Sequence, residues 1–235
     1  MHKLIRQVTT AAAIVGAAAL APQALASTVV VDFESVGLTG FYIANDTFTQ
    51  NYFTMTVDID TGIVDTNIAL IPNDPTGNLT QYYSQLNEGG LIVQRTGGGL
   101  FDLTGFDAAF VPLGTPASGT TVIVAAGVRA DNSSFGVAWL FGGSNNSHFP
   151  FQNYSNPADF AGFTNVKLVE FFACSLNGGC ASPTQNNGQF AIDNIALNFV
   201  PEPNTIVLAL GLMGLMGLPL RRGRSNATRS SATAV

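Results

Sequence analysis

The chain has 235 residues, of which 46% are hydrophobic and 10% are charged, and its formal net charge is −6. This composition excludes an acidic disordered chain, because enough apolar surface is present to offset the entropy cost of folding. It also argues against nucleic-acid binding, which requires a concentrated basic surface. The charge is uneven, since residues 27–200 hold fourteen acidic and three basic residues whereas both ends of the chain are basic.

Residues 1–26 predict a signal peptide. A short basic segment precedes the apolar run at 11–20, and the small residues Ala24 and Ala26 then form a small-x-small pattern. The alternative of a first membrane anchor is disfavoured, because an apolar run of about ten residues is much shorter than the ~20 that span a bilayer. We expect signal peptidase to cleave after Ala26, so that the exported protein begins at Ser27.

Residues 27–200 predict a single all-β domain. Apolar residues alternate with polar ones in Phe53–Asp60, and the β-branched run Thr120–Val128 is followed by a polar turn and the alternating run Phe135–Phe141. These last two runs predict a hairpin. Many short strands separated by Gly- and Asn-rich turns favour an antiparallel β-sandwich of the jelly-roll type.

Trp139 is the only tryptophan and lies in one of these alternating runs. An aromatic ring at this position is compatible with a platform for stacking on sugars. The apolar neighbours on the same face favour burial in the core instead.

Cys174 and Cys180 are the only cysteines of the chain. In an exported protein, a close pair around a Gly-rich segment predicts a disulfide. A metal site would need further ligands nearby, and a free reactive thiol is the other alternative.

Asp193 is an acidic residue in the alternating closing run, where the odd positions Asp193, Ile195 and Leu197 are expected on the apolar face. An ionised carboxylate is costly there unless it is paired or bound to a metal. One interpretation is that Asp193 caps a bulge or accepts backbone N–H bonds. The other is a structural Ca²⁺ ion, held jointly with Asp32 and Glu34 of the opening strand.

Residues 201–224 predict a membrane-sorting segment. A proline-rich triplet precedes an apolar run at 205–220, and an arginine cluster follows the run. The triplet is Pro201, Glu202 and Pro203, and the arginines are Arg221, Arg222 and Arg224. A run of sixteen residues is marginal for a permanent span and favours a temporary anchor, with an ordinary single-pass anchor as the alternative. Residues 225–235 are expected to form a basic disordered tail.

The triplet, the apolar run and the arginines, in this order, resemble the PEP-CTERM sorting signal. This resemblance implies a Gram-negative bacterium and recognition of the triplet by an exosortase. The protein would be an inner-membrane intermediate before its release to the cell surface or the extracellular matrix. The segment 225–235 departs from the family, whose members usually end sooner.

The middle of the chain is also similar to exported carbohydrate-binding jelly rolls that precede such tails. The resemblance is carried by Val30–Glu34, Leu100–Leu103 and Phe190–Ile195. The leading hypothesis is a non-catalytic structural or interaction protein associated with exopolysaccharide, and the alternative is a lectin-like carbohydrate-binding module. A glycoside hydrolase is the third and least favoured hypothesis. Residues 27–200 contain one histidine, His148, and neither a nucleophile elbow nor a phosphate-binding loop, so catalytic motifs find little support in this sequence. No cofactor is expected apart from the possible Ca²⁺.

Overall fold

The computed structural model divides the chain into two units, Met1–Val200 and Pro201–Val235. The residues that it describes all belong to the first unit. They are 27–37, 40–66, 75–87, 89–112, 121–143, 148–175 and 188–199.

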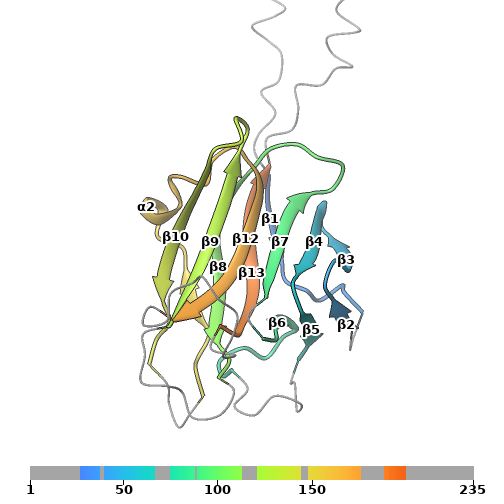
Figure 1. Cartoon of the computed structure of the whole chain (residues 1–235), viewed down its shortest axis with the longest axis vertical. Coiled ribbons are helices and arrows are strands. Elements are labelled where there is room, and N and C mark those ends of the chain that lie inside the picture. Colours follow the sequence, from blue (N-terminus) through green and yellow to red (C-terminus); the bar gives the residue numbers. More distant parts are fainter. Residues whose placement is uncertain are drawn as a thin grey trace, which may run out of the picture. The chain divides into compact units, whose positions relative to one another are not determined.

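The strands of the described residues form one hydrogen-bonded sheet that folds into two antiparallel layers packed face to face, called here the first and the second sheet (Figure 1). The first sheet has the order β2 (Gly40–Ile43), β5 (Thr61–Asp65), β6 (Tyr82–Gln85), β13 (Phe190–Phe199), β8 (Phe101–Phe110) and β11 (Gln152–Tyr154). The second has the order β10 (Ser134–Leu140), β9 (Thr121–Arg129), β12 (Val166–Ser175), β7 (Gly90–Arg95), β4 (Phe53–Asp58) and β3 (Thr47–Gln50). The predicted all-β antiparallel sandwich is confirmed.

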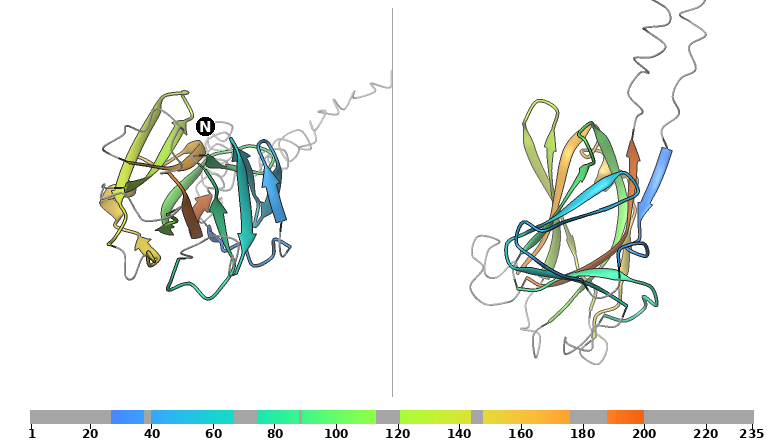
Figure 2. Two further views of the ribbon diagram at one scale, coloured as in Figure 1. Left: turned by 60° about the horizontal axis from the view of Figure 1, so that its bottom comes forward. Right: turned by 90° about the vertical axis from the view of Figure 1, so that its right-hand side faces the viewer.

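Strand β1 (Ser27–Val31) completes the first sheet by pairing with the second half of β13. The right-hand view of Figure 2 shows these two strands side by side. The two sheets are joined where β12 meets β8, through the single pair Val166–Phe101. The first and last strands of the domain therefore adjoin, as the calcium interpretation required.

The predicted hairpin is present as β9 and β10. Asn132 in its turn has a positive φ of 67°, and the Asp131 carboxylate accepts a hydrogen bond from the backbone N–H of Ser133 at 2.9 Å. Strand β4 is shorter than the alternation in the sequence suggested. Ile59 and Asp60 adopt φ values of 54° and 65°, which end the strand at Asp58.

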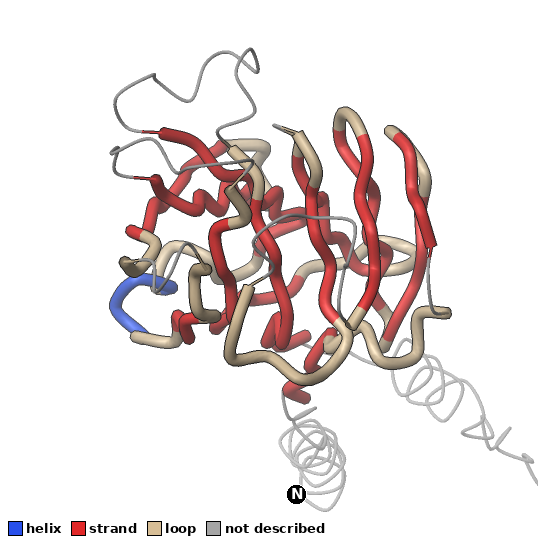
Figure 3. The backbone as a smooth tube through the Cα atoms, turned by 90° about the horizontal axis from the view of Figure 1, so that it is seen from below, coloured by secondary structure: helices blue, strands red, loops and turns tan. Residues whose placement is uncertain are grey.

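One short helix, α2 (Pro157–Phe160), lies at an edge of the described domain (Figure 3). The sequence showed no helical spacing, because four residues are too few to display it. Asn156 caps this helix by accepting a hydrogen bond from the N–H of Ala158 at 3.3 Å. The helix buries Phe160 against the core.

Aromatic side chains dominate the core between the sheets. Phe106 of β8 is 1% exposed, and its ring centroid lies 5.2 Å from Trp139 and 5.1 Å from Phe171. Trp139 is itself only 8% exposed and stacks on Phe160 at 5.3 Å. The expectation that Trp139 belongs to the core is confirmed, and it is not a surface platform.

The closing strand differs from the expected alternation. Asp193 pairs with Asp107 of β8, but the register then shifts, and Ala196 is the next residue to pair, opposite Gly105. Asn194, with φ of 50°, is the residue at this bulge. Asp193 therefore lies on the outer face of the first sheet, and the expectation that it shares a face with Ile195 and Leu197 is wrong.

Phe106→Ala should lower the free energy of unfolding by about 3–5 kcal/mol, because it removes the ring at the centre of the aromatic cluster. Urea unfolding followed by Trp139 fluorescence measures this loss. Phe41→Ala is the matched control, because Phe41 is 60% exposed, and it should change the stability by about 0.5 kcal/mol or less. Equal losses in the two variants would contradict this placement of the core.

Candidate functional site

The outer face of the second sheet carries an acidic residue, Glu170, within a row of cross-strand neighbours. From β10 to β3 the row consists of Gly136, Ala126, Glu170, Ile92, Thr56 and Thr47. The adjacent row consists of Ala138, Val124, Phe172, Gly90 and Asp58. The residues that β9 and β10 contribute to these rows have small side chains, whereas β12, β7 and β4 contribute larger ones.

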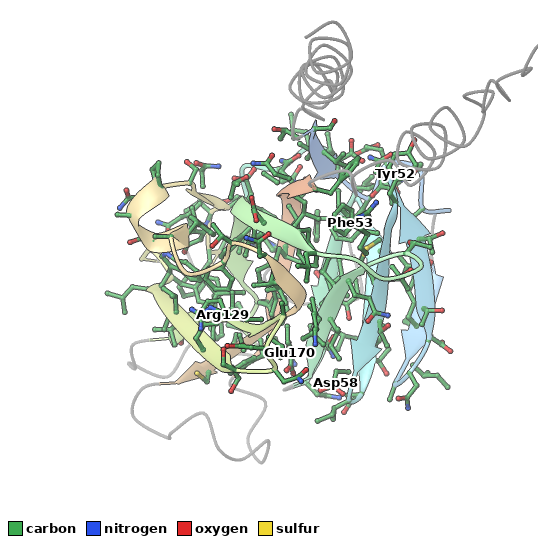
Figure 4. The ribbon with its side chains drawn as sticks, turned by 90° about the horizontal axis from the view of Figure 1, so that it is seen from above. Tyr52, Phe53, Asp58, Arg129 and Glu170 are labelled. Carbon is green, nitrogen blue, oxygen red and sulfur yellow. The ribbon has the colours of Figure 1, made fainter. Side chains whose placement is uncertain are left out.

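Glu170 and Asp58 form a carboxyl pair on this face. Burial raises the pKa of Glu170, and the charge of Asp58 and a side-chain hydrogen bond between the two carboxyl groups raise this pKa further. Two carboxyl groups can share a hydrogen bond only when one of them is protonated. Figure 4 shows the two residues near each other, with Tyr52 on the opposite side of the domain.

Gly90 provides the space for the Glu170 side chain. A Cβ atom at position 90 would lie 3.1 Å from Oε1 of Glu170 and 3.1 Å from the carbonyl oxygen of Phe171. A side chain at position 90 would therefore require the carboxyl group or the Phe171 carbonyl to shift by a few tenths of an ångström. Glycine at this position of β7 leaves Glu170 its present place.

Partly exposed apolar side chains flank the carboxyl pair. Phe172 and Ile92 lie beside Glu170 in the two rows, and both are half-buried. Thr54 and Gln94 are cross-strand partners one step further along the same face. Carboxyl, hydroxyl and amide groups next to an aromatic ring can bind a hydroxylated ligand that also has an apolar face.

The buried Asp193 belongs to a second polar cluster, on the outer face of the first sheet. Its carboxylate accepts hydrogen bonds from Asn78 Nδ2 at 2.7 Å, Thr80 Oγ1 at 3.3 Å and the backbone N–H of Asn194 at 2.8 Å. Burial nevertheless raises the pKa of Asp193 to about 7, and the charge of Asp107 adds to the rise. The bond from Asn194 at the bulge matches the interpretation of Asp193 as a bulge cap.

The other two predicted calcium ligands lie in different surroundings. Glu34 Oε1 accepts a hydrogen bond from the backbone N–H of Gln81 at 2.6 Å, so it contacts the same 78–81 segment that contacts Asp193. Asp32 instead accepts a hydrogen bond from the Gln50 amide at 2.5 Å. Within the described ranges, no three acidic, histidine or cysteine side chains are grouped closely enough to hold a metal ion. Calcium binding therefore stays a prediction.

The remaining predicted residues lie at the edges of the described chain or outside it. Ser27 is the first residue of β1, and Cys174 is a buried residue near the end of β12. Cys180 lies outside the described residues, so the disulfide stays a prediction. Ala24 and Ala26, the triplet Pro201, Glu202 and Pro203, and the arginines Arg221, Arg222 and Arg224 also lie outside them.

In the part of the chain that the structure describes, no helix has both the length and the apolar character needed to cross a membrane. The apolar run at 205–220 lies outside the described residues.

Sequence reasoning did not identify the Glu170–Asp58 pair. The two residues are far apart in the chain, and they meet only because β7 lies between β12 and β4. One signal was present in the sequence, since Glu170 is the only acid in the apolar run Val166–Ala173. A carboxylate in such a strand indicates that one face of the strand is open to solvent.

No known family model and no curated protein matches this chain. Among solved structures, the chain is similar to a DUF4465 family protein from Bacteroides caccae, with 15% identity and a TM-score of 0.45 over 73% of this chain and 98% of that one. It is also similar to TmCBM61 in complex with β-1,4-galactotriose, with 9% identity and a TM-score of 0.32 over 63% of this chain and 98% of that one.

A further similar structure comprises the CBM22-1 and GH10 modules of xylanase 10B from Clostridium thermocellum, complexed with xylohexaose. The identity is 13% and the TM-score 0.29, over 74% of this chain and 28% of that one. At these low identities and TM-scores, the three likenesses establish neither a shared family nor a shared ligand.

The raised pKa of Asp193 predicts a pH-dependent stability. Its ordinary value is 3.8 and its folded value is about 7, so between these values the folded protein holds the proton more tightly than the unfolded chain. The free energy of unfolding should therefore fall as the pH rises from about 4 to 7, by up to a few kcal/mol. Asp193→Asn should flatten this decline, as measured by urea unfolding between pH 5 and pH 8.

The same titration tests the predicted calcium ion. If Ca²⁺ binds Asp193, then added CaCl₂ should raise the Tm of the parent protein most at pH 8, where the carboxylate is ionised, and should have little effect on Asp193→Asn. A parent Tm that does not respond to CaCl₂ or to EDTA would exclude the site.

Proposed function

We propose that this chain is an exported, non-catalytic protein of the cell surface or extracellular matrix that binds exopolysaccharide. The observation that carries this proposal is the outer face of the second sheet, where the Glu170–Asp58 pair lies beside the half-buried ring of Phe172. Carboxyl oxygens accept hydrogen bonds from sugar hydroxyls, and an aromatic ring packs against the apolar face of a pyranose.

The geometry of the pair favours binding over hydrolysis. Glycosidases hold their two carboxyl groups about 5–10 Å apart, with the glycosidic bond between them. The hydrogen bond that contributes to the raised pKa of Glu170 joins this residue to Asp58, so the two carboxyl groups lie closer together than that arrangement requires. A lectin-like role is therefore favoured over the hydrolase hypothesis.

The charge of the domain favours a neutral polysaccharide as the ligand of this face. Residues 27–200 hold fourteen acidic and three basic residues, which gives a net charge of −11. A charge of this sign repels polyanions at long range and leaves neutral glycans unaffected. The Glu170–Asp58 pair adds local repulsion against any anionic sugar on the same face.

The two ends of the chain support export and sorting. A signal peptide at 1–26 directs the chain to signal peptidase, and the segment 201–224 resembles the PEP-CTERM signal that an exosortase recognises. The apolar run at 205–220 then serves as a transient membrane anchor. Both processing steps precede the extracellular role of the sandwich.

Binding to neutral polysaccharide is tested with the exported protein purified from its host. Phe172→Ala should weaken binding in a pull-down or calorimetric titration by about tenfold, because it removes the stacking ring. Glu170→Gln should weaken it by a similar factor if the carboxyl oxygens bind hydroxyl groups. Phe41→Ala is the control, since Phe41 is an exposed aromatic residue on the other sheet and should leave the affinity unchanged. Unchanged binding in both site variants would place the ligand elsewhere.

The sorting step is tested separately in the native host. Glu202→Ala should retain the protein in the membrane fraction, whereas the parent is released to the surface or the medium. Asn204→Ala is the control, because it changes the neighbouring residue and leaves the triplet intact. Release of the Glu202→Ala protein at the parental rate would reduce the segment 201–224 to an ordinary anchor.

A further inference from the structure

The first strand of the domain begins, and its last strand finishes, at the same end of the sandwich. Cross-strand pairs follow one another there in a continuous row that crosses both sheets, namely Arg129, Val166, Phe101, Phe199 and Ser27. The right-hand view of Figure 2 shows the β9–β10 turn and the end of β13 at this end. It is called here the terminal end.

All three basic residues of 27–200 lie at the terminal end. Arg129 belongs to the row itself, and Lys167 follows Val166 in β12. Arg95 is the last residue of β7, and its guanidinium carbon lies 5.3 Å from the ring centroid of Phe199. Three strands of the second sheet therefore each bring one cation to this end.

The net negative charge of the domain lies elsewhere. Among the described residues, the carboxylates at or beside the terminal end are Asp32, Asp102 and Asp131, and each accepts a hydrogen bond from a neighbouring group. These three acids balance the three cations, so the whole net charge of −11 comes from the other residues of 27–200. Cleavage after Ala26 would add the α-amino group of Ser27 to the terminal end.

The two fully aligned cations keep their charge available. Lys167 donates to the amide oxygen of Asn132 at 2.7 Å, and Arg129 donates to the carbonyl oxygen of Gly162 at 3.4 Å, so both partners are neutral. Both cations are half-buried and therefore partly open to solvent. Arg95 adds charge without direct contact, because its side chain lies against Phe199 and the glycine turn that follows β7.

An exposed aromatic residue lies beside these cations. Tyr52, in the turn between β3 and β4, is 72% exposed, and its ring centroid lies 5.8 Å from that of Phe199. Its carbonyl accepts a hydrogen bond from the N–H of Thr96 at 2.9 Å, just after Arg95. Figure 4 looks onto this end and labels Tyr52 and Arg129. Tyrosine is enriched where membranes meet water, because its ring is apolar and its hydroxyl group polar.

The chain beyond the terminal end is short. Five residues, 200–204, separate Phe199 from the apolar run at 205–220 that is proposed as a transient anchor. A fully extended chain of this length spans about 20 Å. While the anchor is in the bilayer, Phe199 is therefore held within that distance of the membrane. A tether at one point limits the distance of the domain but does not set its orientation.

We propose that the terminal end is the surface that faces an anionic phospholipid bilayer while the chain is anchored, with Tyr52 at the level of the headgroups. This inference rests on the anchor of the proposed function. Anionic headgroups attract cations and repel anions over about 10 Å. Since the terminal end has all three cations and the rest of the domain has the net charge of −11, every other surface is repelled more strongly.

This orientation keeps the Glu170–Asp58 face clear of the membrane. Glu170 lies four residues along β12 from Val166, and a strand rises about 3.3 Å per residue, so it lies about 13 Å from the terminal end. Asp58 is the last residue of β4, at the opposite end of that strand from Phe53. The outer face of the second sheet then points sideways, where it is open to polysaccharide.

Tryptophan quenching by phospholipids brominated near the headgroup tests the orientation. The exported full chain is reconstituted in vesicles of phosphatidylcholine and phosphatidylglycerol in equal parts. Trp139 is the only tryptophan of the parent and is 8% exposed, so it gives a low baseline. Tyr52→Trp adds a reporter at the terminal end, and bromolipid should quench its emission about twofold more than that of the parent.

Ile59→Trp is the matched control for this reporter. Ile59 is 54% exposed, has a positive φ of 54° like Tyr52 with 71°, and lies beyond Asp58 at the other end of β4. It should be quenched no more than the parent. In vesicles of phosphatidylcholine alone, quenching of the Tyr52→Trp reporter should fall toward the parent value, and Lys167→Gln should cause a similar fall in the mixed vesicles. Asp60→Asn should leave the quenching unchanged.

Equal quenching of the Tyr52→Trp and Ile59→Trp reporters would overturn the proposal, and so would equal quenching of Tyr52→Trp in neutral and anionic vesicles. Selective quenching that occurs in native membranes but not in protein-free vesicles would also overturn it and indicate a membrane protein as the partner. A chain that does not float with the vesicles refutes the anchor itself, whereas a floating chain without selective quenching refutes only the orientation.

Discussion

The hydrogen bonding of β13 to three other strands holds the first sheet together. Strand β8 pairs along one edge of β13, while β6 and β1 share the other edge. The bulge at Asn194 lets this long strand change register midway, so that Ile192 and Ile195 both face the core although three positions separate them. Asp193 is turned outward by the same bulge, and the core therefore contains no carboxylate from β13.

Turning Asp193 outward does not expose it. The segment that carries Asn78 and Thr80 covers the carboxylate and supplies two of its three hydrogen bonds, while Asp107 lies directly opposite in β8. Burial and a neighbouring negative charge oppose ionisation, and the three donors favour it. Burial has the largest effect, and the group is left close to its titration point at neutral pH. Protonation of the carboxylate relieves this conflict as the pH falls below about 7.

Alternation in the sequence was sufficient to predict the sandwich, the β9–β10 hairpin and the burial of Trp139, because each depends on a period of two within one local segment. The bulge could not be predicted in this way, since Asn194 shifts the register without changing the composition of Phe190–Val200. The Glu170–Asp58 pair was equally inaccessible. Its two residues are separated by more than a hundred positions, and only the placement of β7 between β12 and β4 brings them together.

The Glu170–Asp58 pair follows from the same alternation that builds the core. In β12, Val169 and Phe171 are buried between the sheets, so Glu170 and Phe172 lie on the outer face. Burial and the charge of Asp58 raise the pKa of Glu170, and both effects oppose a second negative charge at this place. An anionic ligand would add to that repulsion, whereas the hydroxyl groups of a neutral ligand would not.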